Sequence, residues 1–192
     1  MYFLTLAIFI INGLLPCSSH EVGAPFCDVH RLERDKEGEV QYIELEYQTL
    51  VRFTPDEMVK YMRSTPLVKM EVKISKKRKK WILTLRGTIH SSQADKFFGG
   101  IDSEHDIRLR MINGNSVYPE VVKVNDPSKI KTSGKGEKRY IAEFSLTEKM
   151  VKSLRKWELD EIGVFWKKGF EAYDVREVGL LQDQIECISK IK

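Results

Sequence analysis

The chain has 192 residues, of which 42% are hydrophobic, 10% aromatic and 31% charged, with twelve glycines and six prolines. These proportions exclude a disordered, collagen-like or multi-span membrane protein, and the length suits one domain or two small ones. Thirty-two basic residues against 28 acidic ones give a formal net charge of +4, too little for a dedicated nucleic-acid-binding protein.

The N-terminal residues form an apolar run from Tyr2 to Leu15 without a charged side chain, and small residues follow at positions 17–19. The run has about fourteen residues, which is too short for a transmembrane helix but typical of a signal-peptide core. We therefore expect residues 1–19 to be a signal peptide and the protein to be secreted or periplasmic, with no transmembrane span after cleavage. The alternatives are an uncleaved anchor, a buried N-terminal helix, and a lipoprotein acylated at Cys17.

The cysteine positions extend this prediction. Removal of residues 1–19 would leave two cysteines, Cys27 near the start of the chain and Cys187 near its end. Compartments outside the cytoplasm permit disulfides, so we expect a Cys27–Cys187 bond that ties the two ends of the mature chain together. The alternative is a pair of free thiols.

An internal repeat is found when the chain is aligned with itself so that Met58 meets Met150. The other identical pairs are Val59/Val151, Lys60/Lys152, Arg63/Arg155, Leu67/Leu159 and Val72/Val164. A Ser/Thr-x-x-Glu capping box opens both copies, as Thr54 to Glu57 in the first and Ser145 to Glu148 in the second. We interpret residues of about 40–88 and 137–178 as two related units, with chance similarity as the alternative.

Each unit predicts a strand, a short helix and a β-hairpin in that order. In the first unit Ile43, Leu45, Tyr47, Thr49, Val51 and Phe53 alternate with mostly polar residues, as on a single strand with one buried face. Met58 and Met62 then share a helical face, and a charged turn joins strands near Met70–Ile74 and Trp81–Leu85. The second unit repeats this order with Met150 and Leu154 on its helix and a turn at Lys168–Gly169.

The remaining segments add strands and one helix. Ile107 to Met111 and Val117 to Val124 read as two strands joined by a turn at Asn113–Gly114. Residues 125–138 are polar and rich in turn formers, so we expect a surface loop. Apolar residues recur at helical spacing near the C-terminus and predict an amphipathic helix with Cys187 facing inward.

These elements predict a mainly β protein with short helices, an α+β fold. We expect an antiparallel β-sandwich-like domain over residues 39–192, built from an internal duplication, preceded by an N-terminal segment at 20–38 and ending in the amphipathic helix. Its two short helices should connect one sheet to the other.

Catalytic signatures are weak in this sequence. We assign no catalytic residue and no cofactor, because the chain has neither a nucleophile elbow nor metal-ligand spacing. The remote metal candidates are the oxygen and imidazole groups of one short loop, namely Asp102, Glu104, His105 and Asp106. Since the loop lacks the glycine and terminal glutamate of an EF-hand, the competing interpretation is a solvated loop with local caps.

The strongest charged feature is a run of five basic residues, Lys76, Lys77, Arg78, Lys79 and Lys80, followed by Trp81. At a hairpin turn such a run forms a compact positive surface able to meet phosphates, sulfated glycans or anionic lipids. The alternative is a solvent-exposed turn that binds no ligand.

Several aromatic residues could lie on the surface. Phe97 and Phe98 precede Gly99–Gly100 and predict either an exposed tip or a buried loop anchor. Trp157 at a helix end and Phe165 on the outward phase of its strand are further candidates.

The second unit resembles a sandwich-like module in exported proteins of Bacteroidota of unknown function. The residues that carry the resemblance are Phe144-Ser145-Leu146-Thr147-Glu148, Leu154, Glu161-Ile162-Gly163-Val164-Phe165-Trp166, Gly169-Phe170-Glu171-Ala172-Tyr173-Asp174-Val175, Gln184 and Cys187. They span roughly residues 137–190. The resemblance implies a secreted or periplasmic β-rich protein and assigns no catalytic residue.

Two functions remain open from the sequence. The first is an exported, non-enzymatic binding module that contacts an extracytoplasmic protein, a glycan or an anionic surface, with no nucleic-acid partner. The second is an extracytoplasmic hydrolase or metal-dependent enzyme that uses the loop of Asp102, His105 and Asp106. Convergence of these side chains in a concave site would favour the enzyme.

Overall fold

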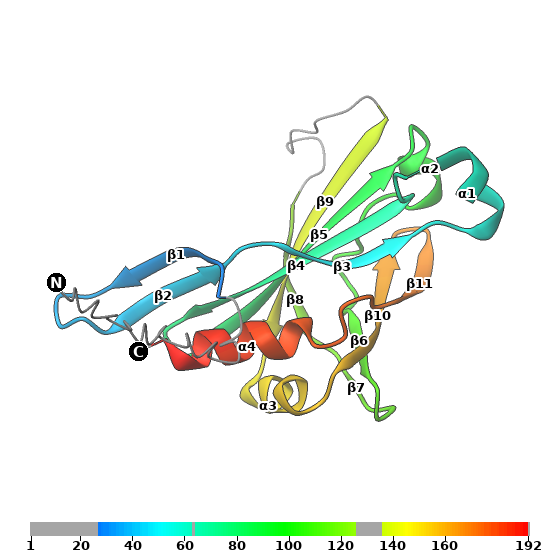
Figure 1. Ribbon diagram of the computed structural model, residues 1–192. Helices are drawn as coiled ribbons and strands as arrows, with labels where there is room; N and C mark the ends of the chain where they lie inside the picture. The colour runs from blue at the N-terminus through cyan, green and yellow to red at the C-terminus, as the bar shows by residue number, and fades with distance from the viewer. Residues whose placement is uncertain (1–26, 63, 126–135, 192) are drawn as a thin grey trace, which may run out of the picture.

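The computed structural model describes residues 27–62, 64–125 and 136–191. The predicted signal peptide, its cleavage site and Cys17 lie outside the described residues. Within them the chain forms eleven strands and four short helices, with the strands in two antiparallel sheets (Figure 1). The predicted mainly β architecture with a C-terminal helix is therefore confirmed.

The larger sheet has seven strands in the order β1-β2-β4-β5-β9-β8, and β3 also pairs with β4. Its strands are β1 (Val29–Arg34), β2 (Val40–Leu45), β3 (Gln48–Phe53), β4 (Val68–Lys77), β5 (Lys80–His90), β8 (Glu120–Val124) and β9 (Glu137–Leu146). Because β4 has ten residues, it pairs with β3 along its first half and with β2 near its end.

The smaller sheet has four strands in the order β11-β10-β6-β7. They are β6 (Arg108–Met111), β7 (Ser116–Val117), β10 (Leu159–Trp166) and β11 (Gly169–Asp174). The helices are α1 (Asp56–Met62), α2 (Ala94–Phe97), α3 (Glu148–Lys156) and α4 (Leu180–Lys190).

One hydrophobic core joins both sheets and the helices α3 and α4. The alternating sequence of β4 places every second side chain in this core. Met70, Val72 and Ile74 are fully buried, and the residues between them lie on the opposite face of the sheet. Trp166 of β10 reaches the larger sheet and meets the Tyr140 ring edge-on at 5.7 Å. We call the opposite, polar face of the larger sheet its outer face.

The disulfide and the C-terminal helix agree with the sequence prediction. Cys27 is bonded to Cys187, with 5.6 Å between the two Cα atoms. Helix α4 buries Leu181, Ile185 and Ile188 in the core and carries Cys187 inward. The bond therefore links the segment before β1 to the last helix.

The single strand predicted over residues 43–53 is wrong in its continuity, and its predicted buried face is confirmed only in part. The chain breaks at Glu46–Tyr47 into β2 and β3, and the register against β4 shifts between Thr49 and Val51. At this irregularity two neighbouring residues are buried, Val51 as predicted and Leu50 against the prediction, and beyond it Phe53 is 40% exposed. The break also turns Tyr47 toward the outer face.

The prediction that both short helices connect the two sheets holds for one of them. Helix α3 leads from β9 in the larger sheet to β10 in the smaller sheet. Helix α1, however, joins β3 to β4, which are neighbours within the larger sheet. Its sheet-to-sheet assignment was therefore wrong, because the repeat alignment matched order along the chain and could not see strand pairing.

The capping boxes are also built differently from the sequence prediction. The Thr54 hydroxyl accepts a hydrogen bond from the Leu67 amide at 3.0 Å. In the second unit the cap of α3 is Thr147, whose hydroxyl accepts from the Met150 amide, and Ser145 lies inside β9. The two units share the order strand, helix, hairpin, and their duplication stays a prediction.

The strand predicted over Val117–Val124 is two strands in different sheets. Strand β7 pairs with β6, whereas β8 pairs with β9. Pro119 lies between them and has no amide to continue the ladder, which explains the break. Three elements were not predicted: β1 inside the segment 20–38, the short helix α2, and the start of β9 at Glu137 and Lys138 inside the predicted loop.

Candidate anion-binding surface

The run of basic residues occupies the tip of the β4–β5 hairpin. Lys77 and Lys80 are cross-strand partners, and Arg78 and Lys79 connect them. Arg78 has a φ of 55°, which is a strained conformation for a residue with a side chain. Its amide and its guanidinium both donate to Gln41 of β2, at 3.0 and 3.1 Å, and these bonds hold the turn against the neighbouring strand.

The charges of this turn are not neutralised by the protein. The side chains of Lys77–Lys80, which we call the basic tip, are exposed and line a surface hollow of about 500 Å³. None of them forms an ion pair with a carboxylate in the part of the chain that the structure describes. Four neighbouring cations without a counter-charge repel one another and attract anions.

Lys76 and Trp81 belong to the interior side of the same hairpin. The Lys76 ammonium lies 4.8 Å from the centroid of the Trp81 ring. Trp81 is 4% exposed, and its indole nitrogen donates to the Glu148 carboxylate of α3 at 3.2 Å. The predicted fifth cation therefore stands apart from the basic tip, and Trp81 anchors the hairpin to the core.

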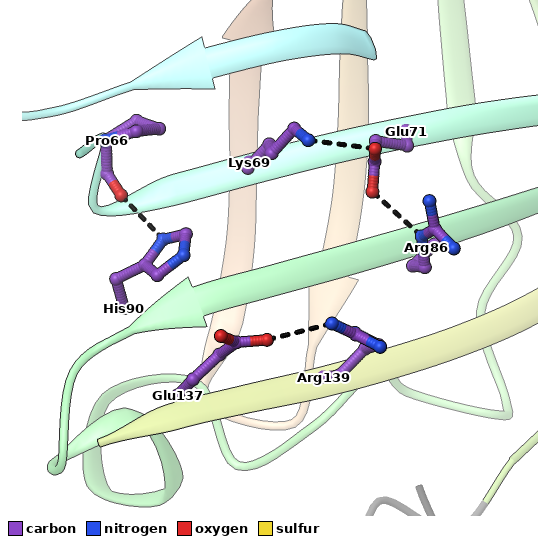
Figure 2. A network of polar contacts seen from close by, with 7 residues as sticks. All are labelled: Pro66, Lys69, Glu71, Arg86, His90, Glu137 and Arg139. Atoms are coloured by element: carbon purple, nitrogen blue, oxygen red, sulfur yellow. Dashed lines mark hydrogen bonds and ion pairs between the residues drawn. The ribbon is translucent and has the colours of Figure 1, made fainter. Parts of the chain in front are cut away.

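A network of ion pairs covers the outer face at the other end of the hairpin (Figure 2). Glu71 of β4 accepts from Lys69 and from Arg86 of β5, both at 2.8 Å. Burial raises the pKa of the Glu71 carboxyl, but the bonds from Arg86 and Lys69 outweigh it and hold the pKa below its usual value. The other contacts in Figure 2 are His90 donating to the Pro66 carbonyl at 2.8 Å and Arg139 donating to Glu137 at 3.0 Å.

Between this network and the basic tip the outer face is hollowed into a groove of about 310 Å³. Strand register arranges its floor in rows that cross the sheet. The rows are Lys73, Thr84 and Glu143, then Ser75 and Ile82, then Lys77 and Lys80 of the basic tip. Successive rows are about 7 Å apart along the strands, so groove and tip form one continuous surface that shares Lys77.

Tyr47 shapes the end of the groove away from the tip. Its ring centroid lies 3.9 Å from the Arg86 guanidinium carbon and 4.6 Å from the Lys73 ammonium, which in turn pairs with Glu44. Burial, followed by the charge of Arg86, lowers the pKa of Lys73, and burial also raises the pKa of Tyr47. Glu143 lies on the opposite side of Lys73.

The acidic loop that the sequence offered as a metal site is satisfied within itself. The Asp102 carboxylate accepts from the Glu104 amide and from the His105 ring, both at 2.9 Å, and these bonds, the amide first, hold its pKa below the usual value. Asp106 accepts instead from the Val121 amide of β8 at 3.2 Å. The His105 ring stacks on Phe165 at 4.8 Å.

These side chains therefore do not converge on one ligand position. Over residues 27–62, 64–125 and 136–191, no group of three or more His, Cys, Asp or Glu side chains is placed to hold a metal ion. None of the described helices is long and apolar enough to cross a bilayer.

The aromatic candidates divide between surface and core. Phe97 is 56% exposed, whereas Phe98 is buried and meets Trp166 edge-on at 5.1 Å. Phe165 faces outward as predicted and packs on Phe170, whose ring lies across Gly163; a Cβ there would come within 2.5 Å of it. Trp157 is 37% exposed at the end of α3.

The groove was not predicted from the sequence. Its residues lie on β2, β4, β5 and β9, at the break between β2 and β3, and at Asn125 after β8. In the sequence, alternating polar positions predict only the solvent side of each strand. The available signal was the row formed by Lys73, Thr84 and Glu143, but it requires the register between β4, β5 and β9. The turn itself was located correctly from the sequence.

Comparison with known proteins identifies no family for this chain. No protein-family model matches the chain, and no curated protein matches it. A solved structure of invasion associated protein B from Bartonella henselae aligns over 82% of this chain and 90% of its own, with 12% identity and a TM-score of 0.34. A likeness at this level carries no statement about family or activity.

Proposed function

We propose that this protein is an exported, non-enzymatic binding module that contacts polyanions through its basic tip. The observation that carries the proposal is the group of exposed cations at Lys77–Lys80, none of which is ion-paired with a carboxylate among the described residues. Bringing these charges together at one turn costs free energy through self-repulsion, and a bound polyanion recovers it.

The proposed location outside the cytoplasm is supported by two separate features. The first is the apolar N-terminal run, and the second is the Cys27–Cys187 disulfide, a bond that persists in oxidising compartments. An anionic glycan or cell surface is a partner available there. The resemblance to exported β-rich proteins is in line with this location.

The proposed contact is electrostatic and therefore sensitive to salt. Exposed charges act over about 8 Å at physiological ionic strength, and the range shortens as salt is added. Affinity should fall steadily with the logarithm of the salt concentration, because binding releases counterions from the polyanion.

The test is retention of the disulfide-bonded protein on immobilised heparin at about 50 mM salt, where screening is weak. The variant replaces Lys77, Lys79 and Lys80 with Gln. A matched control replaces three exposed lysines of α3, Lys149, Lys152 and Lys156, with Gln and so removes the same charge. We expect the wild type and the control to be retained and the tip variant to flow through. A wild type that flows through, or a tip variant retained like the wild type, contradicts the proposal.

A further inference from the structure

The groove on the outer face begins where the basic tip ends. Lys77 lines both hollows, and the row of Lys73, Thr84 and Glu143 lies two rows further along the strands. That distance is about 13 Å, since a strand advances roughly 3.3 Å per residue. A ligand seated on the tip and extended along β4 therefore enters the groove.

The groove floor carries two hydroxyl groups that have no hydrogen-bond partner among the described residues. Ser75 is 7% and Thr84 is 6% exposed, and both line the groove. Neither side chain makes a hydrogen bond to another described residue. Neither oxygen is among the fully buried side-chain atoms that lack a partner, so both hydroxyls reach the hollow, where they can bond a polar ligand or water that a ligand displaces.

The remaining groove residues offer acceptors and apolar surface. Glu143 forms no ion pair with a described residue, and its charge acts on Lys73 from a distance. Tyr42 and Ile82 contribute apolar surface beside these polar groups. Hydroxyls, a carboxylate and flat apolar surface together match a ring that bears hydroxyl groups on its edge and C–H groups on its faces.

We propose that the groove binds the uncharged, hydroxyl-bearing part of an acidic oligosaccharide whose anionic groups lie on the basic tip. This inference rests on the proposed function and names the class of its ligand. The anionic groups of the ligand lie on the basic tip and its hydroxyl groups lie in the groove. The Glu143 carboxylate repels an anionic group in the groove but accepts a hydrogen bond from a hydroxyl group. A simple polyphosphate chain has no group for the groove and contacts the tip alone.

The experiment measures the affinity of the full disulfide-bonded protein for two probes, a heparin-derived oligosaccharide and inorganic polyphosphate of similar charge. The groove variant is Ser75→Ala with Thr84→Val, which removes both hydroxyls at nearly constant shape. The matched control is Thr88→Val, because Thr88 is 5% exposed on the same face of β5 and lies outside the groove. Thermal melts establish that each variant is folded.

We expect the groove variant to bind the oligosaccharide about 5- to 50-fold more weakly, the effect of losing two hydrogen bonds, and to bind polyphosphate like the wild type. The control should match the wild type with both probes. Equal oligosaccharide affinity for groove variant and wild type overturns this inference and leaves the proposed function standing. If the wild type binds neither the oligosaccharide nor polyphosphate, the proposed function itself is overturned.

A second variant serves if the groove variant fails to fold. Glu143→Gln keeps the size of the side chain and removes its charge. The ligand assignment predicts that this variant binds the oligosaccharide more weakly, whereas its binding of polyphosphate is unchanged or stronger. A change in the same direction for both probes would show that Glu143 acts only through long-range charge, and it would refute the hydroxyl contact.

Discussion

The basic tip and the acidic loop at Asp102–Asp106 are both short, charged segments that the sequence singled out. They differ in what their charges contact. In the acidic loop the carboxylates of Asp102 and Asp106 accept backbone amides, and Asp102 also accepts from His105. The tip cations have no carboxylate partner among the described residues and border a groove. Charged groups that are hydrogen-bonded within the protein stabilise a turn. Charged groups without a partner among the described residues are available to bind a ligand.

The largest expected difference between the two segments is in polyanion binding. Replacing Lys77, Lys79 and Lys80 with Gln should weaken heparin binding at low salt by at least about tenfold, since each lost charge-assisted contact costs on the order of 1 kcal/mol. Replacing Asp102 and Asp106 with Asn should leave it unchanged or slightly stronger. Calorimetric titration of both variants measures this, and equal losses would remove the distinction.

A smaller difference is expected in stability, where the acidic-loop variant should lose more than the tip variant. Asp102→Ala should lower the free energy of unfolding by about 1 kcal/mol, because the Glu104 amide and the His105 ring lose their acceptor. The tip variant should be as stable as the wild type or slightly more stable, because repulsion is relieved. Urea denaturation at neutral pH compares the two. A tip variant that is the less stable of the two would mean that its lysines support the fold.

The pH dependence should separate the segments further. The pKa of Asp102 is lowered in the fold, so its stabilising contribution is present above the ordinary value of 3.8 and is lost as the pH falls through the lower folded pKa. The stability difference between wild type and Asp102→Ala should therefore shrink between about pH 5 and pH 2. A stability difference that stays constant in acid would contradict the assigned contacts.

The sequence was sufficient for features that depend on local pattern or on a single pair. It located the charged hairpin turn, the amphipathic helix α4 and the Cys27–Cys187 bond, because turn composition, helical spacing and cysteine number each leave a direct signature. It also assigned the outward phase of Phe165 from simple alternation.

The sequence could not predict features that depend on strand pairing. The break at Glu46–Tyr47 and the register shift between Thr49 and Val51 interrupt the alternation of β3, and no residue type in this segment indicates either irregularity. Pro119 did mark a break, but the change of sheet after it depends on packing. The groove is lined by four strands of the larger sheet, and Ser75 and Thr84 meet on its floor only through the register of β4 against β5, so the sequence could not group them.

The most direct test of the account is a titration of the isotope-labelled, disulfide-bonded protein with a heparin-derived oligosaccharide, followed by the NMR shifts of its backbone amides. The account predicts that the largest shifts lie at Lys77–Lys80 and continue to Ser75 and Thr84, while Glu104–Asp106 and the lysines of α3 remain unchanged. Largest shifts at Glu104–Asp106, or shifts spread evenly over exposed lysines, would contradict it.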